Sequence, residues 1–289
     1  MEELTATQYP VPDYTGPLPE PEPLPEPVTP DNPPWNAWAA IGVWVISILL
    51  IVVLPNLFLL PYLLRQDLDF SNEPLIREFV NTDPMAIVLR ISAIVPAHLL
   101  TLLLGWMVVT RVRKYSFRQT LGWTGGGLRW WHYFIIVGAF FIAVAAASYF
   151  FPDQDNEMKR LLESSRTAVY IIAFMATFSA PLVEEVVYRG LLFPALQRRT
   201  GAALAILIVT FLFAGVHFFQ YWGSPATIVL ITLLSLTLTL IRYRTKSLLP
   251  CVILHTLING IQSLALVAAT FAVDEHPAAA AVHIVKWHF

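Results

Sequence analysis

Seven long apolar segments dominate this sequence and limit what it can fold into. Each is about as long as the roughly 20 apolar residues that a helix needs to cross a bilayer. Only 13% of the residues are charged, against about 25% in a typical soluble domain, so a soluble fold would expose large apolar patches. We therefore predict an all-α, polytopic membrane bundle of seven or eight transmembrane helices. The expected spans are 36–60, 86–110, 131–151, 167–197, 202–220, 225–242 and 248–272.

The ends of the chain differ from this central part. Residues 1–34 are rich in proline and glutamate and contain few large apolar side chains. Such a segment buries too little surface to offset the entropy lost on ordering. We expect a disordered tail at 1–34, a membrane-embedded helical domain at 35–273 and a short C-terminal tail at 274–289.

Basic residues indicate how the bundle is oriented. With seven spans and the N-terminus inside, eleven Lys or Arg residues fall on the inside and seven on the outside. Basic residues favour the cytoplasmic side, so we expect a cytoplasmic N-terminus. We separately expect a multi-pass protein of a prokaryotic plasma (inner) membrane. The fourth span is too long for one straight crossing, and Pro181 predicts a kink or break within it.

Six polar residues lie within the C-terminal spans, where polar side chains are costly. A charge at the centre of a bilayer costs about 2.5–3.5 kcal/mol, so such residues indicate a functional site. Helix arithmetic with a rise of about 1.5 Å per residue brings them to comparable depths from three separate helices. The set is Glu184, Glu185, Arg189, His217, His255 and Asn259.

Spacing within each helix divides this set further. Glu185 and Arg189 are four residues apart, so they share a face and can form an ion pair. Glu184 points about 100° away from its neighbour and lacks that partner. His255 and Asn259 share a face by the same spacing, and Phe213 and His217 do so as well.

These residues resemble three motifs of the CAAX protease and bacteriocin-processing family, also called Abi or type II CAAX endopeptidases. The motifs are Glu-Glu-x-x-x-Arg from Glu184, Phe-x-x-x-His ending at His217, and His-x-x-x-Asn from His255. They occur in the family's order, and the likeness covers about residues 165–265.

The resemblance implies an intramembrane (metallo)endopeptidase that hydrolyses a peptide bond with an activated water. Glu184 would be the base, assisted by His217, while His255 and Asn259 would stabilise the oxyanion or help to hold a metal. Glu185 and Arg189 would orient the site. Glu184, His217 and His255 match a ligand set for zinc or another divalent metal, yet a metal-free glutamate mechanism also fits. The expected partners are the lipid bilayer and a membrane-associated peptide or protein, prenylated or not, with no nucleic acid.

Two other functions remain open. A catalytically silent relative would bind a peptide or act as a bacteriocin-immunity protein, and a proton-coupled transporter would use buried Glu and His side chains as a proton relay. His255 and Asn259 could also serve only as hydrogen bonds between helices. We interpret His98 and Arg90 as structural or interfacial residues, and Ser179 and Ser235 as helix-packing residues.

Overall fold

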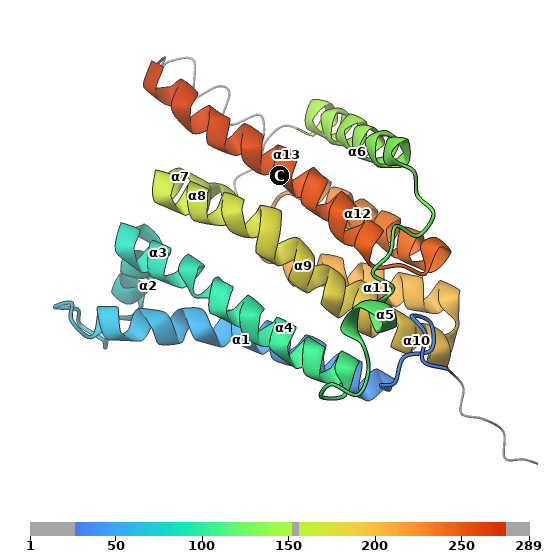
Figure 1. The fold of residues 1–289 in the computed structure, drawn as a ribbon. Helices are drawn as coiled ribbons and strands as arrows, with labels where there is room; N and C mark the ends of the chain where they lie inside the picture. Colours follow the sequence, from blue (N-terminus) through green and yellow to red (C-terminus); the bar gives the residue numbers. More distant parts are fainter. Residues whose placement is uncertain (1–26, 152–155, 276–289) are drawn as a thin grey trace, which may run out of the picture.

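The computed structural model describes residues 27–151 and 156–275, and the regular elements within these ranges are all helices (Figure 1). The elements before the fourth span are α1 (Ala37–Leu63), α2 (Glu73–Thr82), α3 (Pro84–Ser92), α4 (Ile94–Thr110), α5 (Phe117–Leu121), α6 (Trp130–Phe150) and α7 (Glu157–Ser164). The fourth span comprises α8 (Arg166–Phe174), η1 (Met175–Ser179), α9 (Ala180–Glu184), η2 (Glu185–Leu192) and α10 (Phe193–Thr200). The last three helices are α11 (Ala202–His217), α12 (Pro225–Thr245) and α13 (Leu249–Glu275).

The bundle has the length and surface that a membrane protein requires. Six helical stretches are long and apolar enough to cross a bilayer: Ala37–Leu63, Pro84–Thr110, Trp130–Phe150, Arg166–Thr200, Pro225–Thr245 and Leu249–Phe271. The remaining predicted span corresponds to the shorter apolar helix α11. Large apolar side chains such as Leu49, Ile142 and Phe211 are more than half exposed on the outer faces, which suits contact with lipid. The prediction of an all-α, multi-pass membrane protein is confirmed.

The helices lie side by side along one common direction (Figure 1). α4 packs on α1, α13 packs on α8 and η1, and α11 packs between α10 and α12. α6 lies at one edge of the bundle against α12 and α13. The fourth span is therefore surrounded by other helices, and all eight residues of η2 are buried.

The fourth span is continuous but irregular, because π-helical turns interrupt it at η1 and η2. Pro181 is the second residue after η1, and its missing N–H removes one hydrogen bond from the helix. Gly190 permits close packing within η2, since a Cβ there would meet Leu121 at 3.3 Å and Leu248 at 3.5 Å. The kink expected near Pro181 thus takes the form of π-turns rather than a break.

The segment before α1, residues 27–36, is bound to one end of the bundle, here named the N-terminal end. Arg198, in the last turn of α10, donates to the backbone oxygen of Trp35 at 2.8 Å. Arg242, near the end of α12, donates to the backbone oxygen of Pro30 at 2.7 Å. The N-terminal end of the bundle therefore gathers residues that are far apart in the sequence.

The predicted tails are only partly within the structure. Residues 1–26 and 276–289 lie outside the described residues. The end of the predicted N-terminal tail, residues 27–34, is held by the contacts just described, so the tail prediction does not extend to it.

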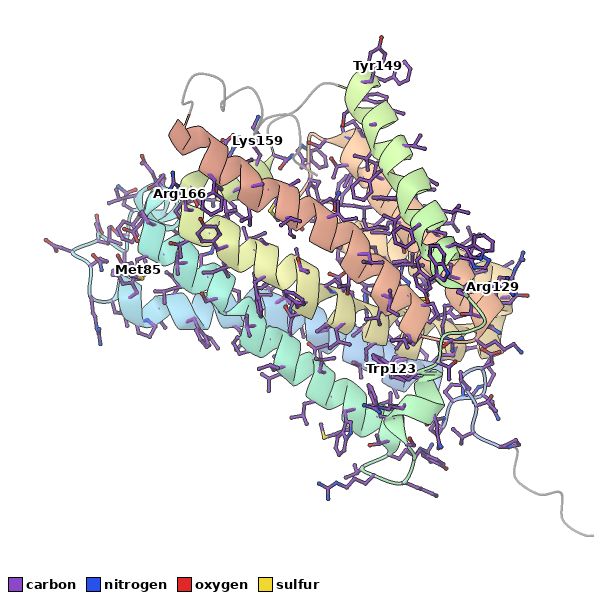
Figure 2. All side chains as sticks on the ribbon, turned by 45° about the horizontal axis from the view of Figure 1, so that its top comes forward. Met85, Trp123, Arg129, Tyr149, Lys159 and Arg166 are labelled. Atoms are coloured by element: carbon purple, nitrogen blue, oxygen red, sulfur yellow. The ribbon has the colours of Figure 1, made fainter. Side chains whose placement is uncertain are left out.

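The opposite ends of the bundle carry different loops. Figure 2 shows Trp123 and Arg129 near the N-terminal end, and Lys159 and Arg166 near the other end. The stretch between α6 and α8 contains the short helix α7, and residues 152–155 lie outside the described residues.

Candidate active site

Four of the six candidate residues line one cavity, here named the central cavity. Its volume is about 720 Å³, and its wall includes Glu184 from the end of α9, His217 from the end of α11, and His255 and Asn259 from α13. The acid, the two imidazoles and the amide therefore meet in one space, although they come from three different spans. The rest of the wall is mainly aliphatic and aromatic.

The other two candidates, Glu185 and Arg189, form a buried network behind this wall. Arg189 Nη1 donates to Glu185 Oε1 at 2.9 Å, and both side chains are 0% exposed. The remaining nitrogens of Arg189 bond to α12: Nη2 donates to Ser235 Oγ at 2.8 Å, and Nε donates to Thr239 Oγ1 at 3.2 Å. Nη2 also donates to the backbone oxygen of Ser235 at 3.0 Å. Every nitrogen of the guanidinium is therefore bonded, as a buried charge requires.

Glu185 also fixes the orientation of His255. Nδ1 of His255 lies 2.8 Å from Glu185 Oε1. A carboxylate accepts hydrogen bonds, so Nδ1 carries the hydrogen. The other ring nitrogen, Nε2, then points to Glu184, whose Oε2 lies 3.7 Å away. One imidazole therefore lies between two carboxylates, of which Glu185 is fully buried and Glu184 is 23% exposed.

His217 approaches the same cavity from the opposite helix. Its Nδ1 bonds to the backbone oxygen of Phe213 at 2.9 Å, so Nδ1 carries the hydrogen and Nε2 remains an acceptor. The ring of Phe213 is close to both imidazoles, with its centroid 5.1 Å from that of His217 and 6.0 Å from that of His255. Among the described residues, His217 has no hydrogen bond to Glu184 or His255. Phe213 thus forms an apolar part of the wall of the central cavity.

Asn259 donates a hydrogen bond to the backbone of the fourth span, which explains part of its position in the site. In η1 the N–H of Ala180 bonds to the oxygen of Met175, five residues earlier. The next bond of this series would join residue 181 to the oxygen of Ala176, but Pro181 has no N–H. Asn259 Nδ2 donates to that oxygen at 3.0 Å. Asn259 therefore compensates for the proline just before Glu184, and its second amide hydrogen remains for the cavity.

The metal ligand set predicted at Glu184, His217 and His255 is not assembled in this arrangement. Across 27–151 and 156–275, no three His, Cys, Asp or Glu side chains are grouped so that they could hold a metal ion. Phe213 packs near both imidazole rings. The metal remains a prediction, and the mechanism below uses only residues of the chain.

Several residues of the site were not predicted as part of it. Ser235 and Thr239 bind Arg189, and their signal was a pair of small polar residues four apart in an apolar span. His98 was interpreted as structural, yet it lines the central cavity and its Nδ1 lies 3.0 Å from Ser179 Oγ. A lone histidine in an apolar span forms no spacing pattern from which its position in the cavity could be predicted.

Comparison with known families agrees with the motifs. A family model described as "Type II CAAX prenyl endopeptidase Rce1-like" matches residues 166–261, a stretch that contains all six candidate residues. No curated protein and no solved structure matches the chain. The family match is consistent with the CAAX protease and bacteriocin-processing family and supports a protease-like function. Residues 166–261 of this chain are thus similar to the Rce1-like type II CAAX prenyl endopeptidase family.

Proposed function

We propose that this chain is an intramembrane endopeptidase that hydrolyses a peptide bond of a membrane-associated peptide or protein in the central cavity. The observation that carries the proposal is the pair formed by Glu184 Oε2 and His255 Nε2, 3.7 Å apart in the wall of that cavity. A carboxylate and an imidazole at this distance, which is longer than a direct hydrogen bond, can hold one water molecule between them.

The charges around His255 support this assignment. Glu185 and Arg189 cancel each other as an ion pair. A negative Glu184 beside a neutral His255 would leave one uncompensated charge in a medium of low dielectric constant. Glu184 therefore depends on His255 for a counter-charge, and both side chains line the central cavity.

The reaction follows from this arrangement. Glu184 accepts a proton from a water molecule as the water oxygen bonds to the carbonyl carbon of the substrate. The carbonyl becomes a tetrahedral oxyanion, and His255 Nε2–H and the second amide hydrogen of Asn259 donate to it. The C–N bond then breaks, and Glu184 passes its proton to the leaving amine, which releases an acid and an amine. His217 Nε2 accepts the second hydrogen of the water and so orients it.

The test is cleavage by the purified full-length chain in lipid nanodiscs, with a library of membrane-anchored fluorogenic peptides. Glu184→Gln removes the base at almost constant volume, and we expect the rate to fall by about 10²–10⁴-fold. Glu78→Gln is the matched control, because Glu78 is an exposed residue of α2 outside the central cavity. Unchanged cleavage by Glu184→Gln would contradict the assignment. Peptide binding without cleavage by the wild-type chain would instead favour the binding or immunity function.

The metal requirement and the substrate preference are tested in separate arms of this assay. Activity with and without a chelator, together with the metal content of the purified chain, tests the proposed zinc or other divalent metal. Matched prenylated and unprenylated peptides test whether the lipid group is recognised. The divalent metal and the recognition of a prenyl group are both proposals from the family resemblance.

We also propose that the N-terminal end of the bundle faces the cytoplasm of a prokaryotic cell. Arg198, Arg199, Arg242 and Arg244 lie in the last turns of α10 and α12, at this end, and basic residues favour the inside. Labelling of single cysteines introduced at Thr124 and Ser71 from either side of the membrane tests this orientation. Labelling of Thr124→Cys from the outside would contradict it.

A further inference from the structure

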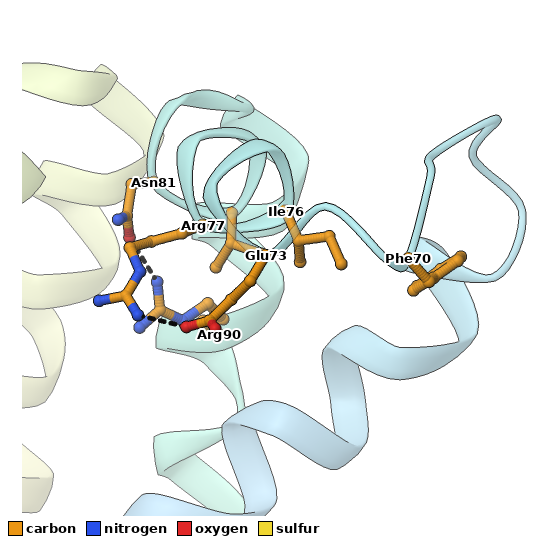
Figure 3. Close-up of a pocket in the computed structure, with 7 residues that line it drawn as sticks. Phe70, Glu73, Ile76, Arg77, Asn81 and Arg90 are labelled. Atoms are coloured by element: carbon orange, nitrogen blue, oxygen red, sulfur yellow. Dashed lines mark hydrogen bonds and ion pairs between the residues drawn. The ribbon is translucent and has the colours of Figure 1, made fainter.

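A second pocket lies at the surface where α2 meets α3, at the end of the bundle away from the N-terminal end (Figure 3). Its volume is about 340 Å³. Its wall combines three charged residues, one amide and three apolar side chains: Glu73, Arg77, Arg90, Asn81, Phe70, Ile76 and Val80. Here it is named the surface pocket.

The surface pocket has an excess of positive charge. Arg77 Nη2 is paired with Glu73 Oε1 at 2.6 Å, so the acid of the pocket already has a partner. Arg90 Nη1 donates to Asn81 Oδ1 at 3.2 Å. No carboxylate of the described residues lies within ion-pair distance of Arg90. With two guanidinium groups and one carboxylate, the pocket has room and charge for one more anion.

Arg90 also lines the central cavity, so it stands at the boundary between the two spaces. It lies six residues after the start of the span Pro84–Thr110, about 9 Å along the helix. A long arginine side chain at that depth extends toward the membrane surface. The phosphate groups of a bilayer lie in the headgroup region at that surface.

An apolar path leads from Arg90 into the bundle. Ile87, Ile91 and Ile94 occupy one face of α3 and α4 and line the central cavity, and His98 follows on the same face. From Arg90 to His98 this path is about 12 Å long. An acyl chain fits such a path, whereas a free inorganic anion would use none of it.

We propose that Arg77, Arg90 and the amide of Asn81 bind the phosphate of a membrane phospholipid, whose acyl chain runs along the isoleucine path at the mouth of the central cavity. The ligand class is a phosphodiester with hydrocarbon chains. The site is independent of the proposed hydrolysis, because none of its residues belongs to the catalytic set.

Native mass spectrometry of the full-length chain, released from detergent, tests the site. The probes are dioleoyl phosphatidylglycerol, dioleoylglycerol with the same chains and no phosphate, and glycerol 3-phosphate with no chains. We expect the wild-type chain to retain phosphatidylglycerol and neither of the other probes. Equal retention of dioleoylglycerol would overturn the phosphate contact, and equal retention of glycerol 3-phosphate would overturn the lipid path.

Variants locate the binding. Arg90→Gln and Arg77→Gln should each weaken phosphatidylglycerol binding by about tenfold, because each removes a charge-assisted hydrogen bond. Arg65→Gln is the matched control, an exposed arginine in the loop between α1 and α2 that does not line the surface pocket. Arg77 is 72% exposed, so we expect its variant to fold and to remain informative if Arg90→Gln unfolds. An equal loss of binding in Arg65→Gln and Arg77→Gln would show general surface charge and overturn the site.

Discussion

Two buried arginines of this protein have opposite surroundings. Arg189, behind the wall of the central cavity, is 0% exposed, and Arg242, at the N-terminal end of the bundle, is 1% exposed. Each guanidinium also lies over a phenylalanine ring, Phe213 for Arg189 at 4.7 Å and Phe193 for Arg242 at 5.9 Å. Burial and stacking are therefore shared, and the difference lies in the hydrogen-bond partners.

All three nitrogens of Arg189 bind side chains or backbone of packed membrane helices. Arg242 instead binds the segment before α1: Nη1 lies 3.3 Å from Asp31 Oδ1, Nη2 donates to the oxygen of Pro30, and Nε has no partner. The side chain of Asp31 is 24% exposed. Arg189 therefore stabilises the geometry of the site, whereas Arg242 attaches the segment before α1 to the end of the bundle.

The largest expected effect comes from removing Arg189. Arg189→Met leaves the Glu185 carboxylate buried without its counter-charge, which should cost about 3–5 kcal/mol of unfolding free energy. Chemical unfolding in detergent, followed by tryptophan fluorescence, measures this loss. The double variant Glu185→Gln with Arg189→Met removes both charges and should lose less. If the single and double variants are equally stable, the ion pair does not control the stability of the cavity wall.

A smaller effect is expected at Asn259, where the partner is a backbone oxygen. Asn259→Ala leaves the oxygen of Ala176 without a donor and should cost about 1–3 kcal/mol. Pro181→Ala restores an N–H that can bond to the same oxygen. In the double variant we expect stability to return while cleavage stays low, because the second amide hydrogen of Asn259 is still missing. Recovery of cleavage together with stability would mean that Asn259 acts only through the helix.

The spans and the motif residues could be predicted from the sequence because both depend on local patterns. Long apolar runs indicate spans, and the four-residue spacing of Glu185 and Arg189 predicts the ion pair that the structure contains at 2.9 Å. The convergence of Glu184, His217 and His255 at one cavity followed from helix lengths. These features need only the rise and period of a helix.

Contacts that depend on how each helix is rotated about its axis could not be predicted. α12 is apolar around most of its surface, so nothing in its pattern directs Ser235 toward Arg189. The bond from Asn259 to Ala176 also required knowing that η1 is a π-helix. The contact of Asp31 with Arg242 joins residues 211 positions apart, and the composition of the segment around Asp31 favoured disorder.

The smallest expected effect comes from removing Arg242, the second of the two buried arginines. Arg242→Met should cost about 1–2 kcal/mol, because Asp31 is partly exposed and can be hydrated once its partner is lost. Asp31 also keeps Lys246, whose Nζ lies 3.3 Å from its Oδ2. Hydrogen exchange should show faster exchange in residues 31–36, with cleavage of the fluorogenic peptides unchanged. A loss of cleavage as large as that of Arg189→Met would contradict this prediction. It would mean that the N-terminal segment influences the site through η2, where the indole of Trp35 donates to the backbone oxygen of Leu191. The two arginines would then serve one function.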